Sequence, residues 1–170
     1  YNLGNILQDL GKFEEAEPSF TQAIKLKPDF TEAHSNLGNT LKALGRLDEA
    51  EASYKDAIAI RPSNAEALHN LSIVQSYLNN SEAETFTLQR ILRIDPDNYG
   101  LIAGVNLAIR DFLKGDFEAS KKHLMASEKI QEKVSPKFKN AKVYYGYLWG
   151  ILKSYDETCV NARNRNTGKT

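Results

Sequence analysis

Residues 3–17 read LGNILQDLGKFEEAE, and residues 37–51 read LGNTLKALGRLDEAE. The two stretches begin 34 positions apart, and a fixed period of this length is typical of proteins built from stacked structural repeats. In each stretch, apolar residues recur at helical spacing on both sides of a glycine, Gly11 or Gly45. Because glycine permits the backbone angles of a tight turn, the pattern predicts a helix, a turn and a second helix in every unit.

Prolines follow the second apolar stripe of successive units at the same spacing, as Pro28, Pro62 and Pro96. Proline cannot continue a helix, and it moves the residue before it out of the helical region. Each of these prolines therefore predicts a break between one helix pair and the next.

The third and fourth units depart from the pattern of the first two. Asn79-Asn80 replaces the turn glycine, and asparagine tolerates left-handed backbone angles. Glu82-Ala83-Glu84 follows Glu49-Ala50-Glu51 one position sooner than the period requires, which predicts a turn one residue shorter than the others. Residues 106–120 align with the second unit at an offset of 70, so two residues are inserted before or within the fourth unit.

The recurring residues are those of a known repeat. The second unit has Leu37-Gly38, Gly45, Ala50, Tyr54, Ala57 and Pro62, and the first has Leu3-Gly4, Gly11, Ala16, Phe20, Ala23 and Pro28. This set resembles the tetratricopeptide repeat, in which small residues let helices approach and an aromatic ring fills the space beside them. The resemblance implies an all-α protein, a superhelical solenoid of antiparallel helix pairs with four to five repeats, the fifth irregular. The repeats are assigned to residues 1–30 (truncated at its start), 31–64, 65–98 and 99–133 (divergent), with a connector and partial fifth repeat at 134–162 and a frayed tail at 163–170.

The resemblance also implies a binding module, because tetratricopeptide arrays hold peptides or partner proteins on a concave face lined by their first helices. An asparagine precedes the leucine of each first helix, and two more lie one helical turn further on. Since asparagine has two donors and an acceptor, a row of them can bond the backbone of an extended peptide. The stretches AHSNLGN and ALHNLS are similar to the repeats of O-linked N-acetylglucosamine transferases, where such a row grips substrate backbone. The predicted peptide- or protein-binding residues are Asn2, Asn5, Asn36, Asn39, Lys42, His69, Asn70, Tyr77 and Asn106.

Two alternatives stay open at the level of sequence. The asparagines could instead bond neighbouring helices or water, which would make them structural residues. The chain is interpreted as a non-catalytic protein–protein interaction module that presents a concave groove to an extended peptide or partner protein. The alternative is the substrate-recruiting arm of a larger, glycosyltransferase-like enzyme whose catalytic domain lies outside these 170 residues. The absence of an initial Met favours a piece of a longer protein.

The composition contains no pattern typical of a catalytic or metal site. The three histidines lie in different repeats, and none forms a zinc-binding pair with the spacing that a metalloprotease helix requires. Cys159 is the only cysteine, so no disulfide or cysteine-rich metal site is expected. No cofactor is predicted, and a cytoplasmic location is the expectation, since a single cysteine is compatible with a reduced compartment. No apolar run approaches the roughly 18 to 20 residues of a membrane helix.

Charge is balanced over the whole chain but unevenly placed. Residues 1–100 carry 9 Lys and Arg against 15 Asp and Glu, whereas residues 101–170 carry 13 against 7. These opposite net charges, −6 and +6, predict at most a weak self-association of the protein. Residues 121–142 are lysine-rich, but the neutral balance argues against a nucleic-acid partner.

Overall fold

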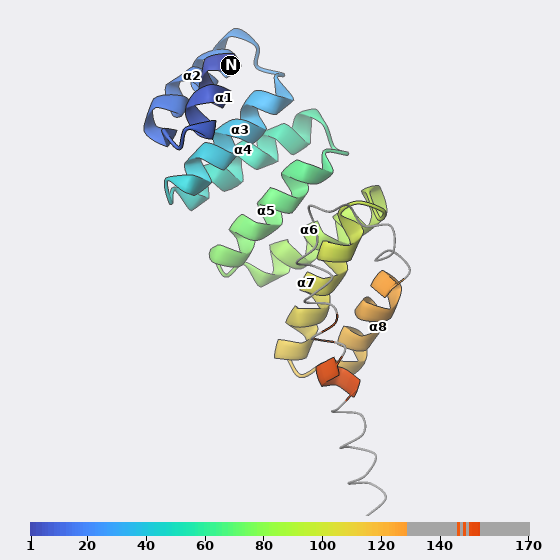
Figure 1. The fold of residues 1–170 in the computed structure, drawn as a ribbon. Helices are drawn as coiled ribbons and strands as arrows, with labels where there is room; N and C mark the ends of the chain where they lie inside the picture. The colour runs from blue at the N-terminus through green and yellow to red at the C-terminus, as the bar shows by residue number, and fades with distance from the viewer. Residues whose placement is uncertain (129–145, 147, 149, 154–170) are drawn as a thin grey trace, which may run out of the picture. The chain divides into compact units, whose positions relative to one another are not determined.

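A computed structural model describes residues 1–128, 146, 148 and 150–153. The regular structure in this part of the chain is helical (Figure 1). The helices are α1 (Asn2–Asp9), α2 (Phe13–Leu26), α3 (Thr31–Ala43), α4 (Leu47–Ile60), α5 (Ala65–Tyr77), α6 (Ser81–Ile94), α7 (Gly100–Leu113) and α8 (Phe117–Glu128). They divide into two compact units, Tyr1–Ile94 (unit 1) and Asp95–Thr170 (unit 2).

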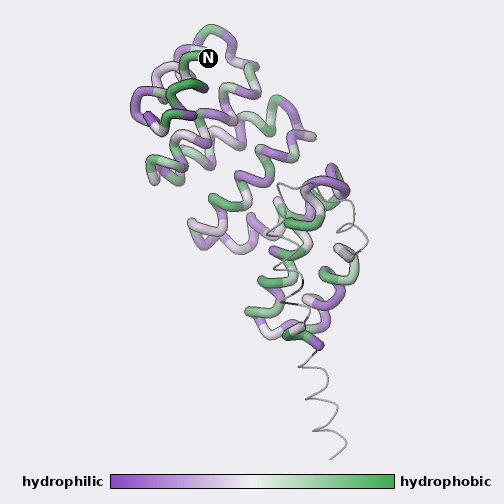
Figure 2. Tube along the Cα trace, viewed as in Figure 1, coloured by the Kyte–Doolittle hydropathy of each residue, from purple (hydrophilic) through white to green (hydrophobic). Residues whose placement is uncertain are grey.

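Unit 1 consists of three antiparallel helix pairs, α1/α2, α3/α4 and α5/α6, which follow one another along the chain (Figure 1). Each helix packs against the next helix in sequence, and the first helices α3 and α5 also contact each other. Apolar and polar residues are interspersed along each of these helices (Figure 2), as expected for helices that bury one face. The predicted all-α array of sequential antiparallel pairs is therefore confirmed.

The turn inside each pair depends on one residue with left-handed backbone angles. Gly11 has φ of 73°, Gly45 has φ of 76°, and Asn79 has φ of 56°. The three residues recur every 34 positions. Asparagine is one of the few residues with a side chain that adopts such angles readily, so Asn79 can replace the glycine.

The third pair keeps the regular register of the repeat. The prediction that its turn is one residue shorter is therefore wrong. Helix α6 begins one full period after α4, and Asn79 lies one full period after Gly45. Glu84 consequently occupies the position of Ala50 and is buried, with 7% of its surface exposed. The Glu-Ala-Glu letters suggested another alignment, but the left-handed residue of the turn decides where the next helix begins.

The core of the first two pairs is built around a glycine of the first helix and an aromatic ring of the second. A Cβ atom at Gly38 would lie 2.7 Å from Cε1 of Tyr54, and one at Gly4 would lie 2.8 Å from Cε1 of Phe20. Both rings are fully buried. The packing role predicted for the recurring small and aromatic residues is therefore confirmed in these pairs.

Unit 2 contains one further helix pair among the residues that the structure describes. Gly115, with φ of 80°, makes the turn between α7 and α8. The buried Ser120 hydroxyl donates to the Ala108 carbonyl at 2.7 Å, and Nδ1 of His123 lies 2.7 Å from a carboxylate oxygen of Asp111. These bonds join α8 to α7.

The partial fifth repeat predicted at 134–162, the tail at 163–170 and Cys159 lie largely or wholly outside the described residues. Within 134–162, only residues 146, 148 and 150–153 are described, and these are helical. The boundaries assigned to the individual repeats stay a prediction.

Candidate functional site

The first helices of unit 1 carry most of the predicted binding residues. Asn36 and Asn70 occupy the same position in α3 and α5, since each lies five residues after the start of its helix. Both side chains are half-buried. The period of the repeat thus places two amides at equivalent points of neighbouring helices that contact each other.

The amide of Asn36 bonds side chains at the start of the chain. Its Nδ2 atom donates to Oδ1 of Asn5 at 2.9 Å and to the Tyr1 hydroxyl at 3.2 Å. The Tyr1 ring packs against Phe20 and Phe30, with ring centroids 5.9 Å and 4.5 Å away. Asn36 therefore joins the second helix pair to the first.

A similar bond joins the second and third pairs. The ammonium of Lys42, on α3, donates to Oδ1 of Asn70, on α5, at 3.1 Å. Burial lowers the pKa of Lys42, because a desolvated ammonium is less stable than a hydrated one. Among the described residues no carboxylate pairs with this ammonium, so its hydrogen bond goes to a neutral amide.

Asn39 bonds within its own helix pair. The Tyr54 hydroxyl donates to Oδ1 of Asn39 at 2.7 Å. Burial raises the pKa of Tyr54, and the negative charge of Glu66 acts in the same direction. The Tyr54 ring is fully buried, so Asn39 satisfies a polar group that would otherwise carry a desolvation cost.

The remaining predicted residues are placed less closely together. Asn2 is exposed on α1, and His69 is half-buried on α5. Tyr77 is 66% exposed and lies seven residues after Asn70, two turns along the same face of α5. Asn106 is half-buried on α7 and belongs to unit 2.

Sequence reasoning missed Tyr1, although the period contained the signal. Tyr1, Ser35 and His69 are spaced by the repeat period, and each precedes an asparagine of the predicted row. The residue type changes at every repeat, so the letters show no recurrence even though the position is the same.

The described amides keep unused hydrogen-bonding capacity. Asn36 has used both amide protons, and its Oδ1 atom accepts nothing among the described residues. Asn5 and Asn70 have the opposite pattern, since their oxygens are occupied and their Nδ2 atoms are not. The face thus offers both acceptors and donors, which is what a peptide backbone requires.

Within residues 1–128 and the short described segments beyond them, no three His, Cys, Asp or Glu side chains gather as a metal site would require. Over the same residues, no helix combines the length and apolarity needed to cross a membrane.

The comparisons with known proteins agree with this architecture. Residues 1–65 match the family model of the tetratricopeptide repeat. A comparison with curated proteins finds no match. Among solved structures, the chain is similar to a crystal structure of MamA protein, with a TM-score of 0.73 and 20% identity, covering 99% of this chain and 88% of that one.

Two further MamA structures show the same likeness. A second crystal structure of MamA gives a TM-score of 0.71 at 18% identity, covering 97% of this chain and 96% of that chain. MamA 41-end from Desulfovibrio magneticus RS-1 gives 0.68 at 20% identity, covering 78% and 73%. The fold is tetratricopeptide-like. At these identities the likeness extends to the fold alone.

Proposed function

We propose that unit 1 is a protein-interaction module that holds an extended segment of a partner polypeptide against α1, α3 and α5. The observation that carries the proposal is the complementary set of unused groups on this face. Oδ1 of Asn36 would accept a backbone N–H of the segment, and Nδ2 of Asn70 would donate to a backbone carbonyl. Bonds to the backbone alone would let the face accept many sequences.

The internal bonds of the amides support this proposal by orienting them. Asn36 is held by Tyr1 and Asn5, and Asn70 is held by Lys42. A side chain that is already fixed loses little rotational entropy when it binds. The alternative interpretation, in which the asparagines join helices, is thus part of the same arrangement, because each amide can do both.

Photo-cross-linking tests the proposed face. A photoreactive aromatic residue replaces Tyr77 on α5, and in a control protein it replaces Leu26, which is 78% exposed on α2. We expect the Tyr77 probe to form adducts with contiguous segments of partner proteins, identified by mass spectrometry. Replacing both Asn36 and Asn70 by Ala should lower the yield by more than tenfold, since two hydrogen bonds of about 1 kcal/mol each are removed and a factor of ten corresponds to about 1.4 kcal/mol.

Circular dichroism and the melting temperature check that the double variant is folded, and Asn70→Ala alone leaves the Tyr1–Asn5–Asn36 bonds in place. Equal adduct yields from the folded double variant and the unsubstituted protein would refute the proposal. So would the same cross-linked segments from the Leu26 probe.

The recruiting-arm alternative requires the same face to bind a substrate polypeptide. It additionally requires a catalytic domain in the same polypeptide. The sequence of the complete gene product separates these two forms of the proposal.

A further inference from the structure

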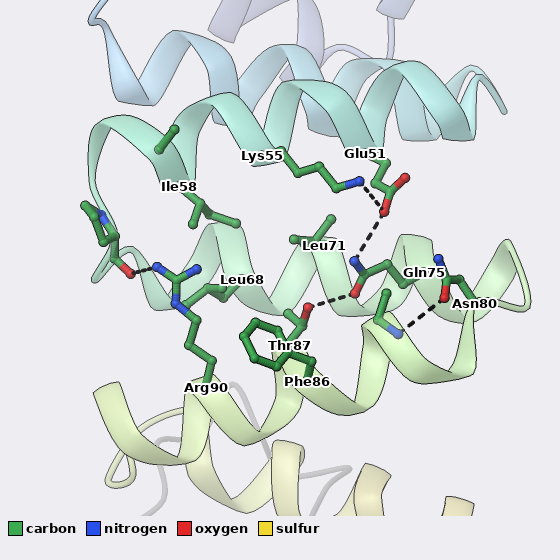
Figure 3. Close-up of a pocket in the computed structure, with 13 residues that line it drawn as sticks. Glu51, Lys55, Ile58, Leu68, Leu71, Gln75, Asn80, Phe86, Thr87 and Arg90 are labelled. Atoms are coloured by element: carbon green, nitrogen blue, oxygen red, sulfur yellow. Dashed lines mark hydrogen bonds and ion pairs between the residues drawn. The ribbon is translucent and has the colours of Figure 1, made fainter.

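A pocket of about 550 Å³ lies between α4, α5 and α6 of unit 1 (Figure 3). Its apolar part is formed by Ile58 of α4, Leu68 and Leu71 of α5, and Phe86 of α6. The three aliphatic side chains are buried, whereas Phe86 is 62% exposed. The volume is within the range of ligand-binding pockets, roughly 300–1,000 Å³. The pocket therefore combines a fixed apolar floor with an exposed aromatic wall.

The pocket is separate from the predicted binding face of unit 1, which carries Asn36, Asn70 and Tyr77 and is called the asparagine face below. On α5 the pocket is lined by Leu68, Leu71 and Gln75, whereas Asn70 and Tyr77 belong to the predicted binding face. With 3.6 residues per turn, these two sets point to opposite sides of the helix. A molecule in the pocket would leave the asparagine face accessible.

One end of the pocket is lined by a chain of hydrogen-bonded polar side chains (Figure 3). Lys55 pairs with Glu51 at 2.9 Å, Gln75 donates to Glu51 at 3.2 Å, and Thr87 donates to Gln75 at 2.8 Å. Burial works against the charge of Glu51, but the bonds from Lys55 and Gln75 outweigh it and hold its pKa below the ordinary value. The charges at this end therefore already have partners.

The apolar end has a cation whose charge has no such partner. Nη2 of Arg90 donates to the carbonyl oxygen of Pro62 at 2.8 Å. Among the described residues no carboxylate pairs with this guanidinium. Residues 1–100 carry a net charge of −6, so Arg90 is a local cation in an acidic part of the protein. A bound molecule with a carboxylate beside its apolar part would complement it.

The equivalent surface one repeat earlier, formed by α2, α3 and α4, carries an ion pair between helix pairs. Arg46, just before α4, donates to Glu17 of α2 at 2.7 Å. Asn80 holds the Arg46 position in the third repeat, and its side chain instead accepts from the Ala83 N–H at 3.2 Å. No side chain at this position therefore spans the pocket.

Two other positions distinguish the pocket from the equivalent surface one repeat earlier. Phe86 stands where the second repeat has Ala52, and Arg90 stands where it has Asp56. All four positions are on the second helices, so an aromatic wall and a positive charge have replaced a methyl group and a negative charge.

We propose that the pocket is a second docking site, which binds the apolar face of an amphipathic helix from a partner protein and pairs an acidic residue of that helix with Arg90. The residues of α4 that line the pocket run from Glu51 to Ala59, about 12 Å at the helical rise of 1.5 Å per residue. That length matches the two turns over which a helix presents anchors at i, i+3 or i+4, and i+7. Exposed aromatic residues such as Phe86 are typical anchors of protein interfaces.

A peptide library tests the site with the full chain. Its helical members carry Leu at i, i+3 or i+4, and i+7, and the position beside the last Leu is Glu, Gln or Lys. We expect retained members to carry Glu there and to bind at least about tenfold more tightly than their Lys counterparts. In methyl NMR spectra the bound peptide should shift the signals of Ile58, Leu68 and Leu71.

Matched variants assign the binding energy to the pocket. Phe86→Ala, which installs the residue of the preceding repeat, should weaken binding about tenfold or more. Arg90→Glu should reverse the preference, so that Lys peptides bind more tightly than Glu peptides. Leu26→Ala removes an exposed apolar side chain outside the pocket and should change nothing.

The proposal is overturned by a library with no members retained, by equal binding of Glu and Lys peptides, or by full affinity in folded Phe86→Ala. Signal shifts confined to the asparagine face would overturn it as well. Replacement of Asn36 and Asn70 by Ala should leave this binding intact, so the two proposals fail independently.

Discussion

The second and third helix pairs fill the same core position in different ways. In the second pair, Gly38 leaves room for the Tyr54 ring, whose hydroxyl bonds Asn39. In the third pair the equivalent residues are Ser72, Leu88 and Ile73. Ser72 and Leu88 are buried, so the shorter Leu side chain occupies the aromatic position and a hydroxymethyl group occupies the glycine position.

The difference between the pairs concerns polar groups as well as volume. The Tyr54 hydroxyl requires an acceptor, and Asn39 provides it. Where Leu88 has no polar group, Ile73 replaces the amide, and the Ser72 hydroxyl donates to the His69 carbonyl of its own helix at 2.8 Å. The three substitutions therefore go together in these two pairs, since the amide accompanies the hydroxyl and the glycine accompanies the ring.

Placing one residue of the third pair's set into the second pair should have the largest effect on stability. We expect Gly38→Ser alone to lower the free energy of unfolding by about 2–3 kcal/mol, because its Cβ atom would meet the buried Tyr54 ring and overpacking costs are of that size. Urea unfolding followed by circular dichroism measures the change.

The matched control transfers the whole set. The triple variant Gly38→Ser, Asn39→Ile, Tyr54→Leu reproduces the third pair, and it should recover most of the stability lost in the single variant. A triple variant less stable than Gly38→Ser would show that the three positions are not coupled.

A smaller effect is expected at the turns, where the pairs differ by Asn79 in place of glycine. Asn79→Ala should lower the free energy of unfolding by about 1 kcal/mol, because alanine is disfavoured at a φ of 56°. Asn79→Gly, which restores the residue of the first two pairs, should retain full stability in the same urea titration. Equal stabilities of the Ala and Gly variants would contradict the backbone explanation.

The smallest expected effect concerns the bond between Glu51 and Gln75. Gln75 occupies the position in the third pair that Leu41 occupies in the second, so the second pair has no equivalent bond. The pKa of Glu51 lies below its ordinary value of 4.5, so its contribution to stability is present above that value and is lost as pH falls through the lowered pKa. We expect the stability difference between the unsubstituted protein and Glu51→Gln to be about 0.5 kcal/mol at neutral pH and to vanish in acid. Urea titrations at a series of pH values measure it, and a pH-independent difference would contradict the role of the charge.

The helix pairs could be predicted from sequence because their causes are local. Glycine at Gly11 and Gly45 and proline at Pro28 and Pro62 act on the backbone of their own or the preceding residue, so their spacing alone indicates helices and breaks. The register of the third pair could not be read from its letters, because Glu84 occupies the Ala50 position that the repeat pattern assigns to a small residue.

The candidate site was only partly predictable for the same physical reason. The period placed Asn36 and Asn70 at equivalent points, but the bonds to Tyr1, Asn5 and Lys42 depend on which helices become neighbours. The pocket gave no sequence signal, because Phe86 and Arg90 look like ordinary residues of an exposed helix face.

The sequence by itself determined the helix–turn–helix pairs and the breaks between them in the first two repeats, since backbone permissiveness and helical periodicity are properties of short segments. Tertiary structure alone decided which partners the polar side chains on the helix surfaces find. Arg46 pairs with Glu17 of the preceding helix pair, whereas Asn80 at the equivalent position bonds within its own helix and Gln75 bonds Glu51 instead. That outcome requires side chains from different helix pairs to meet, and only the packing of one helix pair on the next determines whether they do.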